Sequence, residues 1–79
     1  MNVQEARETI AQVLRRIAPD VDVDELPDDV PLREELELDS LDFLSFVEQL
    51  SKTSGRRIEE SDYGELATKA SCIAFLSAA

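Results

Sequence analysis

The chain of 79 residues contains no histidine, no tryptophan, two glycines and a single cysteine, Cys72. Without histidine, a Ser–His–Asp triad is excluded. A single cysteine cannot form an internal disulfide, so nothing indicates an oxidising compartment. No histidine, lysine or cluster of metal ligands is placed to activate the thiol, and we expect Cys72 to be a small, partly buried hydrophobic residue.

Basic residues are also scarce. Eight lysines and arginines face 18 acidic residues, which gives a net charge of −10 and a pI near 4.2. Such a surface repels nucleic acid and anionic membranes, which argues against both as partners. It favours basic protein partners, in complexes that weaken as salt rises.

Long apolar runs are missing too. None approaches the ~20 residues that span a bilayer, so no membrane insertion is expected. The segment Met1–Glu5 lacks the basic start and apolar run of a secretory signal. The hydrophobic content of 43% is ordinary for a folded domain. We therefore expect one monomeric, cytoplasmic domain over residues 1–79, with a core near the lower size limit for independent folding.

Two long helices are strongly indicated. The first has a capping box at Asn2 and Glu5 and ends at Ala18, before Pro19. Its apolar stripe comprises Val3, Ala6, Ile10, Val13, Leu14 and Ile17. The second should run from Ser40 to Ser51 or Lys52, between the N-cap Asp39 and Gly55. Its core face comprises Phe43, Phe46, Val47 and Leu50.

Between these helices lies a long acidic loop, 20–31, with six acids and two prolines. The spacing of Asp20, Asp22 and Asp24 matches the first ligands of a calcium loop, but Glu25 and Pro31 replace its glycine and final glutamate. No dedicated metal site is expected.

Three shorter helical segments complete the predicted fold. One turn is expected within 32–38 and another within 61–66, followed by a last helix over 67–78. The face of that last helix should carry Leu66, Ala70, Ile73 and Ser77. The fold class is all-α, a small bundle of three main helices plus one short helix, with the long acidic loop between the first two main helices.

Ser40 stands where a charged loop meets the start of the second long helix. Its hydroxyl should be accessible and close to unpaired backbone N–H groups, which would hold an attached phosphate. Catalysis by Ser40 is not expected, because Lys52 and Lys69 are distant in sequence and so small a core offers no cleft. An ordinary capping or first-turn serine is the alternative.

The segment 36–42, Leu-Glu-Leu-Asp-Ser-Leu-Asp, resembles the acyl carrier protein signature Leu-Gly-Leu-Asp-Ser-Leu-Asp. The similarity covers most of the chain, including the helix order, the acidic loop and the closing helix with Ile73, Phe75 and Leu76. The resemblance implies an acyl-carrier-like bundle. It also implies that a phosphopantetheinyl transferase, using Mg²⁺, attaches 4′-phosphopantetheine from coenzyme A to Ser40, with Asp39 as motif neighbour.

By the same resemblance, the protein carries acyl thioesters to the loading, elongating or acyl-transfer enzymes of fatty-acid, lipid or polyketide biosynthesis, and is not an enzyme. Basic patches on these partners would dock on Leu41, Asp42, Leu44 and Glu48, although a merely solvated acidic face is the alternative. An acyl pocket is implied, and its candidate lining residues, each also readable as plain core, are Phe43, Phe46, Val47, Ile58, Leu66 and Ile73.

The chain departs from the family pattern at several positions. Glu37 replaces the usual glycine, Ser45 a frequent acid and Lys69 a frequent apolar residue. These changes favour a carrier in a specialised pathway. Two alternatives stay open, namely a stand-alone aminoacyl or peptidyl carrier, which more often has Gly-Gly in the motif, and an unmodified acidic interaction module.

Overall fold

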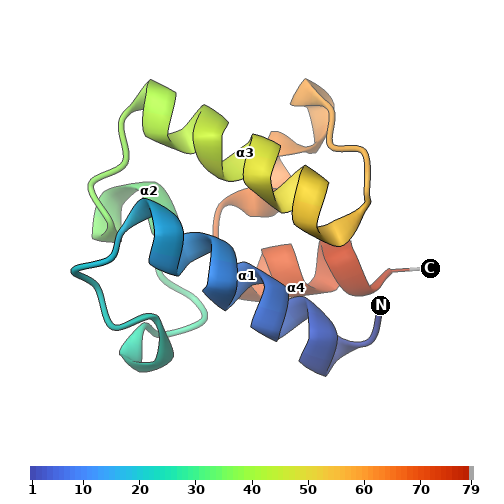
Figure 1. Ribbon diagram of the computed structural model, residues 1–79, viewed down its shortest axis with the longest axis horizontal. Helices are drawn as coiled ribbons and strands as arrows, with labels where there is room; N and C mark the ends of the chain where they lie inside the picture. The colour runs from blue at the N-terminus through green and yellow to red at the C-terminus, as the bar shows by residue number, and fades with distance from the viewer. Residues whose placement is uncertain (79) are drawn as a thin grey trace.

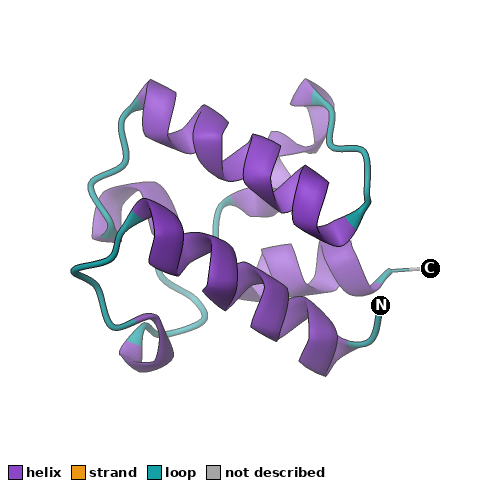
Figure 2. Cartoon of the chain, viewed as in Figure 1, coloured by secondary structure: helices purple, strands orange, loops and turns teal. Residues whose placement is uncertain are grey.

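A computed structural model describes residues 1–78, and within that range the regular structure is all helix, with no strand. Figures 1 and 2 show the helices gathered into one small bundle. The elements in chain order are α1 (Val3–Ile17), η1 (Val23–Glu25), α2 (Leu32–Glu35), α3 (Ser40–Ser54), η2 (Glu60–Leu66) and α4 (Lys69–Ser77). None of the described helices has the length and apolarity needed to cross a membrane. The predicted all-α bundle is confirmed.

The start of α1 is fixed by the predicted capping box. The Glu5 N–H donates to Asn2 Oδ1 at 2.8 Å, and the Asn2 N–H donates to Glu5 Oε1 at 3.0 Å. The helix ends at Ile17, and Ala18 is its C-cap just before Pro19. Between these two ends, α1 packs against both α3 and α4 (Figure 1).

The core lies where α1, α3 and α4 meet. Four of the six residues of the predicted α1 stripe are fully buried, whereas Ile17 is half-buried and Val3 is exposed. From α3, the four predicted core residues are all buried. The largest fully buried side chains are Phe46, Ile10, Leu14, Leu32, Leu50, Leu66, Val13 and Cys72.

The acidic loop is pinned to α1 and α4 by Asp28. Its carboxylate accepts two hydrogen bonds from the Arg7 guanidinium, at 3.0 and 3.1 Å, which lower the pKa of Asp28. Lys69 Nζ lies 3.5 Å from the same carboxylate and donates to the Val23 carbonyl at 3.1 Å. The Ala70 N–H donates to the Asp28 carbonyl at 3.0 Å. These contacts explain why a lysine can be buried in this core.

The predicted end of α3 and both predicted ends of α4 are wrong. α3 continues to Ser54, beyond the expected Ser51 or Lys52, because Gly55 adopts a left-handed φ of 71° and caps the helix by donating to the Ser51 carbonyl. α4 begins at Lys69 and ends at Ser77, so it is shorter than the predicted 67–78. Thr68 is extended and its hydroxyl accepts from the Ser71 N–H, which sets the start of α4.

The predicted face of the last helix is also wrong. Ala70 is exposed and Leu66 belongs to η2, whereas the buried residues of α4 are Lys69, Cys72, Ile73 and Leu76. Cys72 is fully buried instead of partly buried, and desolvation raises the pKa of its thiol to about 12. Because α4 is apolar around most of its circumference, its sequence contains little periodic signal from which to read the buried face.

Candidate functional site

Ser40 is the first residue of α3, and its side chain is exposed. Asp39 precedes it as the N-cap, with Oδ1 accepting the Asp42 N–H at 2.8 Å and the backbone carbonyl accepting the Phe43 N–H at 2.9 Å. The predicted cap is confirmed. The cap belongs to Asp39, so the Ser40 hydroxyl is not needed to start the helix.

The start of α3 retains unsatisfied donors beside that hydroxyl. Among the described residues 1–78, no acceptor pairs with the backbone N–H groups of Ser40 and Leu41. Such groups at the positive end of a 15-residue helix favour an anion. The exposed hydroxyl and these N–H groups together fit a phosphate ester on Ser40.

The turn that delivers the chain to Ser40 is a Schellman motif at the end of α2. The Leu38 N–H donates to the Arg33 carbonyl at 2.9 Å, and the Glu37 N–H donates to the Glu34 carbonyl at 3.3 Å. Glu37 occupies the left-handed position of this motif, with φ of 52°. The buried pair Leu32 and Leu38 provides the apolar contact typical of the motif. The turn therefore forms without the usual glycine, but it holds an L-residue in a strained conformation.

Replacing Glu37 by glycine should raise the free energy of unfolding by about 0.5–1 kcal/mol. Glycine removes the cost of a left-handed L-residue, and the greater freedom of the unfolded chain offsets part of that gain. Glu37→Val should destabilise, because a β-branched side chain tolerates positive φ poorly. Urea unfolding midpoints would measure both effects. In the matched control Glu34→Gly, at a helical position of α2, a loss of stability is expected. A wild-type midpoint for Glu37→Gly would refute the strain.

An open pocket of about 430 Å³ lies beside Ser40. Phe43 forms one wall, and its ring meets the edge of Tyr63 from η2 at a centroid distance of 5.5 Å. Most of the lining is apolar. The lining residues are Arg33, Ser40, Phe43, Leu44, Tyr63, Gly64 and Ala67. The pocket thus joins the Ser40 hydroxyl to a space between α3 and η2.

This pocket shares only Phe43 with the predicted acyl pocket. Phe46, Val47, Leu66 and Ile73 belong to the buried core cluster, and Ile58 packs against it. Sequence reasoning missed four lining residues: Arg33, Tyr63, Gly64 and Ala67. A signal existed for Arg33 alone, because it is the single base within 20–48.

The predicted docking residues form an exposed patch on the first three turns of α3. Leu41 is 77% exposed and Leu44 is 42% exposed, so both are large apolar side chains left outside the core. Asp42 and Glu48 are exposed as well. We call these four residues the α3 patch. Leu44 belongs both to this patch and to the lining of the pocket, so the two features are continuous.

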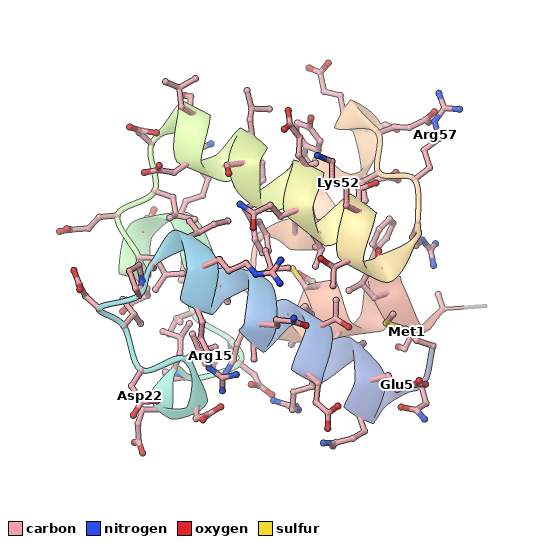
Figure 3. All side chains as sticks on the ribbon, viewed as in Figure 1. Met1, Glu5, Arg15, Asp22, Lys52 and Arg57 are labelled. Atoms are coloured by element: carbon pink, nitrogen blue, oxygen red, sulfur yellow. The ribbon has the colours of Figure 1, made fainter. Side chains whose placement is uncertain are left out.

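Three acids of the loop, Asp22, Asp24 and Asp28, make contacts within the protein. Asp22 Oδ1 accepts the Asp24 N–H at 3.2 Å, and the Asp24 carboxylate pairs with Arg15 at 3.2 Å. Figure 3 shows Arg15 on α1 and Asp22 on the loop that follows it. Over residues 1–78, no three histidine, cysteine, aspartate or glutamate side chains are grouped to hold a metal ion.

Comparison with known proteins gives one match. A sequence model for the phosphopantetheine attachment site matches residues 4–76, which is nearly the whole chain. No curated protein and no solved structure matches. Members of this family bind 4′-phosphopantetheine covalently, in agreement with the resemblance to acyl carrier proteins. With its exposed serine at a helix start and its match over residues 4–76, the chain belongs to the phosphopantetheine attachment site family.

Proposed function

We propose that the protein is an acyl carrier and that Ser40 is the residue to which 4′-phosphopantetheine is attached. The observation that carries this proposal is the position of Ser40, which is exposed at the start of α3 and lines the pocket. Asp39 supports the role because it caps the helix and leaves the Ser40 hydroxyl to react. When attached, the group supplies a flexible arm whose thiol holds an acyl group as a thioester.

Backbone N–H groups at the start of α3 and the apolar pocket would position the arm. The N–H groups of Ser40 and Leu41 face the position of the phosphate, and the apolar pocket beside them suits an apolar cargo. In this proposal the chain binds, presents and releases cargo, and partner enzymes perform the chemistry. The cargo belongs to fatty-acid, lipid or polyketide synthesis, in a specialised pathway of the cytoplasm.

Partners are proposed to dock on the α3 patch. A phosphopantetheinyl transferase and later acyl-handling enzymes must each reach Ser40, and the patch directly follows it in α3. Two exposed leucines between acids suit a partner with a basic surface and a small apolar centre. Such contacts are fast and salt-sensitive, as a shuttle requires. The patch therefore favours a docking surface for partner enzymes over a merely solvated acidic face.

Incubation with coenzyme A, Mg²⁺ and a broad-specificity transferase tests the attachment. We expect a mass gain of one phosphopantetheinyl group on the wild type and none on Ser40→Ala. Ser45→Ala is a matched control on the same helix and should load fully. No gain on the wild type, or a gain that survives Ser40→Ala, would overturn the proposal. The intact mass of native protein separates the alternatives: an aminoacyl or peptidyl cargo indicates a peptidyl carrier, and a bare Ser40 in every preparation indicates an interaction module.

A further inference from the structure

The pocket beside Ser40 contains one cationic side chain. Among the described residues that line it, Arg33 supplies the charge, and the remaining surface is mostly apolar. A guanidinium is an unexpected component of an apolar pocket, especially within a segment where acids outnumber it twelve to one, 20–48. Its presence indicates that an anion or a strong acceptor belongs at this end of the pocket.

Two contacts hold Arg33 toward the start of α3. Its backbone carbonyl accepts the Leu38 N–H in the Schellman turn, which fixes the residue relative to the chain two positions before Ser40. Its guanidinium carbon lies 5.0 Å from the centre of the Phe43 ring. Phe43 is three residues after Ser40 and therefore on a neighbouring position of the same helical face. The cation and the Ser40 hydroxyl group therefore belong to residues that line the same pocket, with Phe43 common to both.

The guanidinium of Arg33 is not committed to another acid. Three glutamates surround it in sequence, at positions 34, 35 and 37, yet no carboxylate among residues 1–78 forms an ion pair with it. Arg7 and Arg15, by contrast, each pair with an aspartate. The five N–H donors of Arg33 are consequently available to a ligand that enters the pocket mouth.

We propose that Arg33 is a positioning residue that donates hydrogen bonds to the phosphodiester of the arm on Ser40. This inference rests on the proposed function. A phosphodiester bonded to Ser40 Oγ must lie at the mouth of the pocket, where it carries a full negative charge. Guanidinium pairs with phosphate oxygens in a bidentate geometry that ammonium does not reproduce. Together with the N–H groups of α3, Arg33 would turn the base of the arm toward the pocket.

A comparison of apo and holo forms tests this pairing. The wild type, Arg33→Gln, Arg33→Lys and the control Lys52→Gln are each loaded to completion, as judged by intact mass. Lys52 is exposed and lies toward the opposite end of α3 (Figure 3), so its removal matches the charge change without touching the pocket. Two readouts follow: the holo-minus-apo shift in Tm, and the ³¹P resonance of the phosphodiester.

We expect the upward holo-minus-apo shift in Tm to be lost in Arg33→Gln, reduced in Arg33→Lys and retained in Lys52→Gln. The ³¹P resonance of Arg33→Gln should differ from that of the wild type, whereas the resonance of Lys52→Gln should not. Added salt should move the wild-type resonance toward that of Arg33→Gln, because the pair is solvent-accessible. Wild-type values for both readouts in Arg33→Gln would overturn the inference. Failure of the proposed function looks different, since the wild type would then gain no mass or would gain it without Ser40.

Discussion

Replacing Asp42 and Glu48 together by lysine is expected to lower the kcat/KM of loading by a transferase about tenfold to a hundredfold at low salt. Both carboxylates are exposed on α3 near Ser40, where a basic partner must approach. Reversal turns attraction into repulsion at the same contacts, and a loss of ~1.4 kcal/mol in the encounter corresponds to each tenfold change. Loading rates measured by mass spectrometry at several substrate concentrations would give the ratio.

The matched control for this variant is the double reversal Asp20→Lys with Asp29→Lys. It changes the net charge equally, but both residues lie on the loop between α1 and α2 and are exposed. Its kcat/KM should stay within about threefold of the wild type, because the Coulomb interaction weakens with distance and these charges lie on a segment remote in sequence from Ser40. Equal losses in the two double variants would show that the effect depends on net charge alone. The α3 patch would then not be the docking surface.

Replacing Asp28 by alanine should lower the free energy of unfolding by about 1.5–3 kcal/mol, since hydrogen bonds to charged groups contribute in that range. The change removes both bonds from Arg7 and leaves the Lys69 ammonium buried without its carboxylate. In a domain of this size the Tm should fall on the order of 10 °C. Asp29→Ala is the control next in sequence and should melt close to the wild type.

The pH dependence of this effect has a defined sign. Hydrogen bonds from Arg7 lower the pKa of Asp28 in the folded protein, so the folded state binds this proton less readily than the unfolded chain. The stabilisation is fully present above the unfolded pKa, about 3.9, and is lost as pH falls through the lower folded pKa. The difference between wild type and Asp28→Ala should therefore stay constant above about pH 5 and shrink toward acid.

A second substitution isolates the buried lysine. Adding Lys69→Met to Asp28→Ala should recover part of the lost stability, because it removes the uncompensated charge and keeps apolar volume. Additive losses in the double variant would show that Lys69 does not depend on Asp28. A full wild-type midpoint for Asp28→Ala would contradict the whole network.

Local signals explain which parts of the fold were predictable. The starts of α1 and α3 depend on neighbouring residues, the box at Asn2 and Glu5 and the cap at Asp39, and both predictions are confirmed. The core faces of these helices follow from regular apolar spacing. The same locality made Ser40 visible as a candidate, because its features lie within a few residues of sequence.

The remaining features depend on contacts between distant residues. The burial of Lys69 requires Asp28 and the Val23 carbonyl, which only the folded loop brings to it. The pocket requires η2 to place Tyr63 against Phe43, a pairing across twenty residues that no periodic pattern encodes. For α4, apolar residues on nearly every side left the register to be set by the Thr68 cap and by packing.

The burial of Cys72 bears on how long an acyl group would remain on the proposed arm. Exchange of an acyl group between thiols requires an accessible thiolate. Cys72 has no exposed surface, and its pKa of about 12 keeps it protonated at neutral pH. Since the chain has no other cysteine, it offers no accessible thiol to which a thioester on the arm could migrate. In the proposed carrier, an acyl group is therefore not lost by thiol exchange within the chain.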